Sequence, residues 1–231
     1  MSTNLTTWYP EVLAKVPGVP PPTALAAILE GARKFCERTH IWIETLPEID
    51  IVADTNTYAL TKSGAELIMV VNAKYKQAKS DGTESDDDQY YTLAPASEET
   101  LDRLLSGSWE WRETTSPTEY YISDYSEPES WVLSFTEIPT EASTDGLRVK
   151  VAVKPDNSAT TINDLFWSNH KDAISYKACA ILFSQTATPW GNIQLALSFN
   201  ELFNSECTKA SMFRRKGGTN RDMRFVYPKF V

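Results

Sequence analysis

The stretch "NDLFWSNHKDAISYKACAILFSQT" at residues 163–186 decides the fold. The side chain of Asn163 can accept hydrogen bonds from free backbone N–H groups, and Asp164 suits the positive end of the helix dipole, so a helix is predicted to start here. From Ala173 to Phe183, apolar residues cover nearly the whole circumference of that helix. Because a helix that is apolar all round is surrounded by other elements, we expect it to be the central helix of a bundle.

A second helix follows after a short corner. Pro189 and Gly191 end the central helix, and apolar residues then recur at steps of three and four. The short connection predicts that the two helices are antiparallel. The second one is expected to run from Ile193 to Arg215, about 34 Å at 1.5 Å per residue. Its predicted apolar stripe is Leu195, Phe199, Leu202, Phe203, Ala210 and Phe213.

Two further helices are predicted near the N-terminus. Thr6 or Thr7 can cap a short helix through Val16, and three prolines at residues 20–22 lead into a longer helix from Thr23 to Trp42. The apolar stripe of the longer helix is expected to pack on the central helix. That stripe is Leu25, Ile28, Leu29, Ala32, Phe35, Cys36 and Trp42, whereas Arg33, Lys34, Glu37 and Arg38 are expected to turn away.

After Trp42 the apolar period changes from 3.6 to 2, which predicts an inserted antiparallel β region, a small barrel or sandwich. The expected fold class is therefore α+β. An antiparallel helical bundle is built from residues 1–43 and 156–213, the inserted β domain is 44–155, and residues 214–231 form an extended C-terminal arm. Candidate strands are Ile49–Val52, Thr57–Leu60, Leu67–Tyr75, Tyr90–Leu93, Trp109–Glu113, Glu119–Ile122, Trp131–Thr136 and Leu147–Lys154, with a short helix at Ser97–Gly107.

Charge is distributed unevenly along the chain, whose net charge at pH 7 is −9. From Lys209 onward there are seven basic residues and one acidic residue, so this end carries +6 and the remaining residues carry −15. Affinity for nucleic-acid phosphates comes mainly from Lys and Arg. The acidic body is therefore not expected to grip nucleic acid.

Cysteines and hydropathy indicate the compartment. Cys36, Cys179 and Cys207 lie inside predicted helices without the spacing of a metal site, and we interpret them as free buried thiols in a reducing compartment. The N-terminus does not read as a signal peptide, and no apolar run reaches the roughly 18 to 20 residues that span a bilayer. We expect a protein made and used in the cytoplasm, or in something assembled there, without membrane contact.

Patterns for catalysis and metal binding are weak. His40 and His170 are the only histidines. We interpret both as structural, with a protonated His40 ring favoured by the dipole at a helix C-terminus. Motifs for nucleophile elbows, phosphate loops, dinucleotide binding and zinc proteases are absent from the sequence. The acidic run at residues 80–89 misses the spacing of a calcium loop and is interpreted as a mobile hairpin loop. We predict no catalytic residues, no metal and no cofactor.

The last stretch, "FRRKGGTNRDMRFVYPKFV" at residues 213–231, alternates cations with aromatic residues. It has no core-forming period, and exposed aromatic side chains at a chain end need a partner to bury them. The expected partner is nucleic acid or an acidic protein groove. The residues concerned are Arg214, Arg215, Lys216, Arg221, Arg224, Phe225, Tyr227 and Phe230.

The order and spacing of four segments are the basis for a comparison with a known family. They are "VLAKVPGVPPPTALAAILEGARKFCERTHIWIETLPEI" at residues 12–49, "VAVKP" at 151–155, the central helix, and the corner Pro189-Trp190 before a helix with Phe199 and Phe203. In order and spacing, from residue 12 to residue 213, they resemble the head-to-tail adaptor (connector) proteins of tailed bacteriophages.

The resemblance implies a non-enzymatic ring of about twelve copies under the portal, prolonging the DNA channel toward the tail. It implies the portal protein and a downstream tail or nozzle protein as partners, and DNA that passes through the channel without sequence-specific binding. It also implies a place at the head–tail junction of the virion, after synthesis in the host cytoplasm. In such adaptors a C-terminal arm docks on the portal, and here that role maps onto the eight basic and aromatic residues of the last stretch.

Two other interpretations stay open. Aromatic residues on predicted strands could form a glycan- or receptor-binding virion module, although strands also place such residues in cores. An enzyme acting on cell-wall glycan would need two carboxylates roughly 5 to 9 Å apart in a cleft. The aromatic residues of the first interpretation, the glycan- or receptor-binding module, are Trp109, Trp111, Tyr120, Tyr121 and Trp131.

Overall fold

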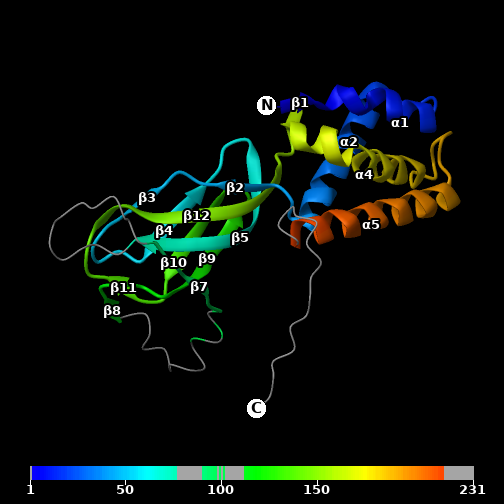
Figure 1. Cartoon of the computed structure of the whole chain (residues 1–231). Coiled ribbons are helices and arrows are strands. Elements are labelled where there is room, and N and C mark those ends of the chain that lie inside the picture. The colour runs from blue at the N-terminus through cyan, green and yellow to red at the C-terminus, as the bar shows by residue number, and fades with distance from the viewer. Residues whose placement is uncertain (1, 77–89, 98, 100, 102–111, 216–231) are drawn as a thin grey trace, which may run out of the picture. The chain divides into compact units, whose positions relative to one another are not determined.

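The chain folds as a mixed α+β protein in two units, which we call the helical unit (Met1–Ile41 and Asn157–Val231) and the β unit (Trp42–Asp156). The structure, a computed structural model, describes residues 2–76, 90–97, 99, 101 and 112–215, apart from the side chain of Arg215 (Figure 1). The helical unit contains β1 (Ser2–Asn4), η1 (Leu5–Trp8), α1 (Tyr9–Lys15), α2 (Pro21–Thr39), β13 (Thr161–Asn163), α4 (Asp164–Phe183) and α5 (Ile193–Arg215).

The helix α4 is the central helix of its unit, as predicted, and packs against α1, α2 and α5. The side chain of Asn163 accepts a hydrogen bond from the backbone N–H of Leu165 at 3.0 Å, which confirms the predicted cap. Its second half is largely buried, and the buried Ser175 hydroxyl donates to Glu11 of α1 at 3.2 Å. A kink at His170, where φ is −134° and ψ is 19°, interrupts the helix without a glycine or proline nearby.

The helices α2 and α4 approach closely at a glycine. A Cβ atom on Gly31 would lie 3.0 Å from the carbonyl oxygen of Ile174, so any side chain at this position would require the two backbones to move apart by a few tenths of an ångström. One turn further along α2, the ring of Phe35 lies 6.2 Å from that of Phe166 and 5.0 Å from that of His170. The expected packing of this helix on the central one is confirmed.

The ends of α2 differ from the prediction. It begins at Pro21, because proline suits the first helical turn, where its missing N–H needs no partner. It ends at Thr39, since His40 takes the left-handed conformation with φ 49°. Trp42 therefore leaves the helical stripe and packs on the core of the β unit. Arg33, expected to face solvent, is 8% exposed and lies 3.7 Å from Glu30.

The first residues form a small sheet that periodicity did not predict. β1 pairs antiparallel with β13, so two segments far apart in sequence meet beside the start of α4. The side chain of Asn4 accepts a hydrogen bond from the backbone N–H of Thr6 at 2.9 Å and caps η1. The expected cap at Thr6 or Thr7 is wrong, because the helical turn starts at Leu5.

Two sheets and a separate pair of short strands make up the described part of the β unit. One has the order β2-β12-β5-β6, with β3 also on β12, and the other has the order β4-β10-β9-β7. Their strands are β2 (Ile43–Thr45), β3 (Ile49–Ile51), β4 (Thr57–Thr61), β5 (Ala65–Lys76), β6 (Tyr90–Thr92), β7 (Ala94–Pro95), β9 (Glu119–Glu127), β10 (Ser130–Phe135) and β12 (Ser143–Pro155). A separate pair joins β8 (Glu113–Thr114) to β11 (Ile138–Pro139).

The two sheets share one apolar core, in which the Phe135 ring lies 5.2 Å from that of Tyr58 and 5.9 Å from that of Tyr75. The long ladders are antiparallel, as predicted. Two pairings of two residues each, β7 with β9 and β8 with β11, are parallel, so the expectation of a purely antiparallel domain is wrong there. The predicted helix at Ser97–Gly107 and the acidic run at 80–89 lie largely outside the described residues.

Candidate functional site

The structure describes only the first two residues of the predicted arm, which are the last two residues of α5. The side chain of Arg214 donates to the backbone carbonyl of Thr39 at 3.4 Å. That carbonyl belongs to the last turn of α2, where the helix dipole favours a cation, so the contact ties the ends of two helices together. The structure describes only the backbone of Arg215. The other arm residues, Lys216, Arg221, Arg224, Phe225, Tyr227 and Phe230, lie outside the described residues.

The pKa values of both histidines are lowered. Burial lowers the pKa of His40, and the positive charge of Arg214 lowers it further. Both effects disfavour the protonated His40 ring that the sequence suggested, because the Arg214 cation already lies at the end of α2. Burial also lowers the pKa of His170, although the carboxylate of Glu206 opposes that shift. His170 packs on Phe35, which agrees with a structural role.

One face of α5 is bound to its own unit. Lys177 of α4 donates to Asn200 at 3.0 Å and lies 5.2 Å from the ring centre of Phe203. The rings of Phe183 and Phe199 stack at 5.6 Å, and Arg38 of α2 donates to Asn204. The fully packed positions of this face are Ala196, Phe203, Cys207 and Ala210.

Half of the predicted stripe of α5 lies elsewhere. Leu195, Leu202 and Phe213 are 41%, 46% and 54% exposed, so their predicted place in the core is wrong. Spacings of three and four residues are compatible with two neighbouring lines along one helix. The line that packs against the unit is rotated around the helix axis from the line that carries Leu195, Leu202 and Phe213. The sequence interpretation also missed Ile193, Leu197 and Met212, which are more than half exposed. The hydrophobicity of these three side chains is the only feature of the sequence that could have drawn attention to them.

The aromatic residues of the β unit mostly pack inward. Tyr120 is 5% exposed and burial raises its pKa, while Trp131 packs against the core. Trp109 and Trp111 lie outside the described residues, and Tyr121 is half-buried. These positions offer no exposed platform for a glycan in the described part of the chain. The structure thus gives the glycan- or receptor-binding interpretation no support.

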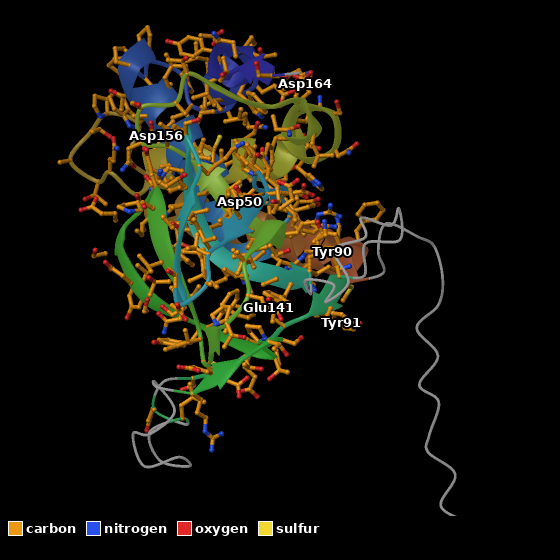
Figure 2. The ribbon with its side chains drawn as sticks, turned by 90° about the vertical axis from the view of Figure 1, so that its left-hand side faces the viewer. Asp50, Tyr90, Tyr91, Glu141, Asp156 and Asp164 are labelled. Atoms are coloured by element: carbon orange, nitrogen blue, oxygen red, sulfur yellow. The ribbon has the colours of Figure 1, made fainter. Side chains whose placement is uncertain are left out.

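Other aromatic residues are exposed. Tyr125 is 71% exposed and Tyr91 is 42% exposed, the latter beside Tyr90 in Figure 2. Tyr90 is engaged, because the Arg148 guanidinium lies 4.2 Å from its ring centre and its hydroxyl donates to the Asp145 carbonyl at 3.0 Å. Scattered exposed side chains of this kind are ordinary on protein surfaces.

The described residues give little support for metal binding or for a reactive thiol. Among the residues that the structure describes, no group of His, Cys, Asp or Glu side chains is placed to hold a metal ion. Cys36, Cys179 and Cys207 are buried, and burial raises the pKa of the Cys179 and Cys207 thiols to about 11. None of the described helices is both long and apolar enough to cross a membrane.

Comparison with known proteins assigns the chain to a protein family. Residues 3–224 match the family model described as SU10 adaptor protein, which covers both the helical unit and the β unit. No curated protein matches the chain. The family match covers the four segments whose order suggested an adaptor.

Proposed function

The chain belongs to the SU10 adaptor protein family of phage head-to-tail adaptors, and we propose that it forms a ring of about twelve copies between the portal and the tail. The match over residues 3–224 carries this proposal, because it spans nearly the whole chain. The family is one of structural virion proteins. The ring would lie at the head–tail junction, contact the portal protein above and a tail or nozzle protein below, and let DNA pass.

The charge distribution supports a conduit for DNA. Outside its basic end the chain carries −15, and like charge keeps phosphates from binding the wall of a channel. DNA would pass without sequence-specific contacts, and the protein would act without a cofactor. The helical unit would form the ring, with the β unit facing the tail or the outside.

The basic arm is proposed to dock on the portal. Its charge of +6, counted from Lys209, suits an acidic groove, and Phe225, Tyr227 and Phe230 would serve as anchors. The contact of Arg214 with Thr39 supports this, because it holds the end of α5 in place at the point from which the arm departs.

Imaging of the full-length protein mixed with its cognate portal tests the proposal. We expect a closed ring of about twelve subunits stacked on the portal in class averages. A persistent monomer that never joins the portal would contradict the adaptor role proposed here.

Truncation after Arg215 tests the arm separately. The shortened protein should remain folded and lose portal binding, whereas Asp222→Asn, which removes the only acid of the arm, should retain it. Portal binding by the truncated protein would leave the ring proposal in place and refute the docking role of the arm.

A further inference from the structure

Positive charge in the β unit is concentrated on two neighbouring strands. β5 and β12 carry five basic and two acidic residues, which gives +3, whereas the other residues of the unit carry four basic and 21 acidic residues, which gives −17. The two strands pair with each other over most of their length (Figure 1). A unit that is acidic elsewhere therefore has one positively charged region. Its five basic residues are Lys74, Lys76, Arg148, Lys150 and Lys154.

The basic side chains of this region lie on one face of the sheet. Tyr75 and Val149, which are fully buried in the core, each separate two of the basic residues along a strand. Because successive side chains of a strand point to opposite faces, the basic residues point away from the core. Tyr90 of β6 shares this outer face, since its ring centre lies 4.2 Å from the Arg148 guanidinium. We call Lys74, Lys76, Arg148 and Lys150 the basic strip.

The basic strip brings like charges close together. Lys74 lies directly opposite Arg148, and Lys150 follows two residues further along β12. Side chains directly opposite one another are about 5 Å apart at Cβ, and residues two apart on one strand are about 7 Å apart. Glu48 pairs with Arg148, but within the described parts of the chain neither Lys74 nor Lys150 forms an ion pair. Like charges at such distances destabilise a sheet, so a bound polyanion would stabilise it.

We propose that the basic strip binds the phosphate backbone of double-stranded DNA. Each Lys or Arg that neutralises a phosphate releases a counterion, so a few such contacts give weak, salt-dependent binding without sequence preference. The acidic remainder of the unit would repel the duplex elsewhere and so orient it toward the strip. Contacts of this kind let a protein slide along DNA, which is compatible with passage of the duplex. The inference rests on the proposed conduit and names the residues that would touch DNA in it.

Salt-dependent DNA binding by the full-length protein tests the strip. Lys74→Gln combined with Lys150→Gln removes two charges from the strip, and both side chains face away from the core, so this strip variant should fold. The matched control, Lys34→Gln with Lys209→Gln, removes two ion-paired lysines of the helical unit. Fluorescence anisotropy follows the binding of two unrelated duplexes of about 30 base pairs between about 20 and 150 mM salt.

We expect the strip variant to bind at least about tenfold more weakly than the wild-type protein at about 50 mM salt. The slope of log K against log salt concentration should become smaller by about 1.8, since each phosphate contact contributes about 0.9. The control variant should behave as the wild-type protein does, and the two duplexes should bind equally. Lys74→Arg with Lys150→Arg keeps both charges and should retain binding.

Three results would overturn the inference. Equal losses in the strip variant and the control variant would show that net charge alone governs binding. An unchanged affinity of the strip variant would show that DNA binds elsewhere on the chain, and no binding by the wild-type protein at about 20 mM salt would show that it does not bind DNA. None of these results bears on the adaptor role, which imaging of the wild-type protein with the portal tests separately.

Discussion

Asn163 shows how one residue joins two elements. It ends β13, where it pairs with Ser2, and its side chain caps α4 by accepting the N–H of Leu165. Asn192 caps α5 in the same way, because its side chain accepts hydrogen bonds from the backbone N–H groups of Gln194 at 3.1 Å and Leu195 at 3.2 Å. Each cap satisfies backbone donors that the first helical turn leaves free. These two asparagines therefore fix where the long helices of the C-terminal half begin.

His170 gives a prediction at the same scale. Burial lowers its pKa in the folded protein, so folding favours the neutral ring. The stability that depends on the neutral ring is complete above the ordinary pKa of 6.5 and is lost as the pH falls through the lowered folded value. The free energy of unfolding should therefore decrease below pH 6.5, and His170→Gln should make that decrease smaller. Urea unfolding at several pH values between 7.5 and 5 measures it.

The comparison uses the slope with pH rather than the absolute stability, since glutamine also changes the packing on Phe35. His40→Asn is the comparison variant: it removes the other lowered pKa and leaves the titration of His170 in place, so the decrease due to His170 should persist in it. An unchanged pH dependence in His170→Gln would show that this ring does not couple folding to pH.

At the scale of elements, the crossing of α2 over α4 depends on close backbones. Gly31→Leu should push the helices apart, because its Cβ would already lie 3.0 Å from the Ile174 carbonyl oxygen and 3.3 Å from the Ala178 nitrogen. Overpacking of this kind costs roughly 1 to 3 kcal/mol, and contact with backbone atoms places it at the upper end. The denaturation midpoint of the free protein measures the loss.

The control for this crossing is Ala26→Leu, an enlargement at an exposed position of the same helix. It should change the midpoint little. Equal effects of the two substitutions would mean that α2 can shift on α4 without loss of stability.

At the scale of the whole molecule, the β unit has its two ends side by side. The Trp42 carbonyl accepts a hydrogen bond from the N–H of Val153 at 2.9 Å, and Ile43 pairs with Ala152. An insertion whose ends are adjacent can be removed without separating the segments that flank it. The helical unit and the β unit each have a core of their own.

We therefore expect residues 42–156 to fold alone, and the helical unit to fold when a short Gly-Ser linker replaces them. Each product should unfold cooperatively on heating, and circular dichroism should show mainly strand in the first and mainly helix in the second. A β unit that folds alone beside a helical unit that does not would indicate that the insertion supports the bundle. The reverse result would indicate the opposite dependence.

Local chemistry made much of this protein predictable from its sequence. The spans of α4 and α5, the cap at Asn163 and the main strands of the β unit follow from apolar period, capping residues and prolines, all of which act over a few residues. The order of these segments also suggested the family that the match over residues 3–224 supports. The charge contrast between body and arm could be read directly from the sequence.

Only the tertiary structure decided which segments meet. The pairing of β1 with β13, the transfer of Trp42 to the β core and the burial of Arg33 all depend on partners far away in sequence. The exposed Leu195, Leu202 and Phe213 of α5 show the same limit, because periodicity marks a residue as apolar but does not show which neighbour reaches it. A helix can carry two apolar lines, and the packing of α4 determines which one is buried.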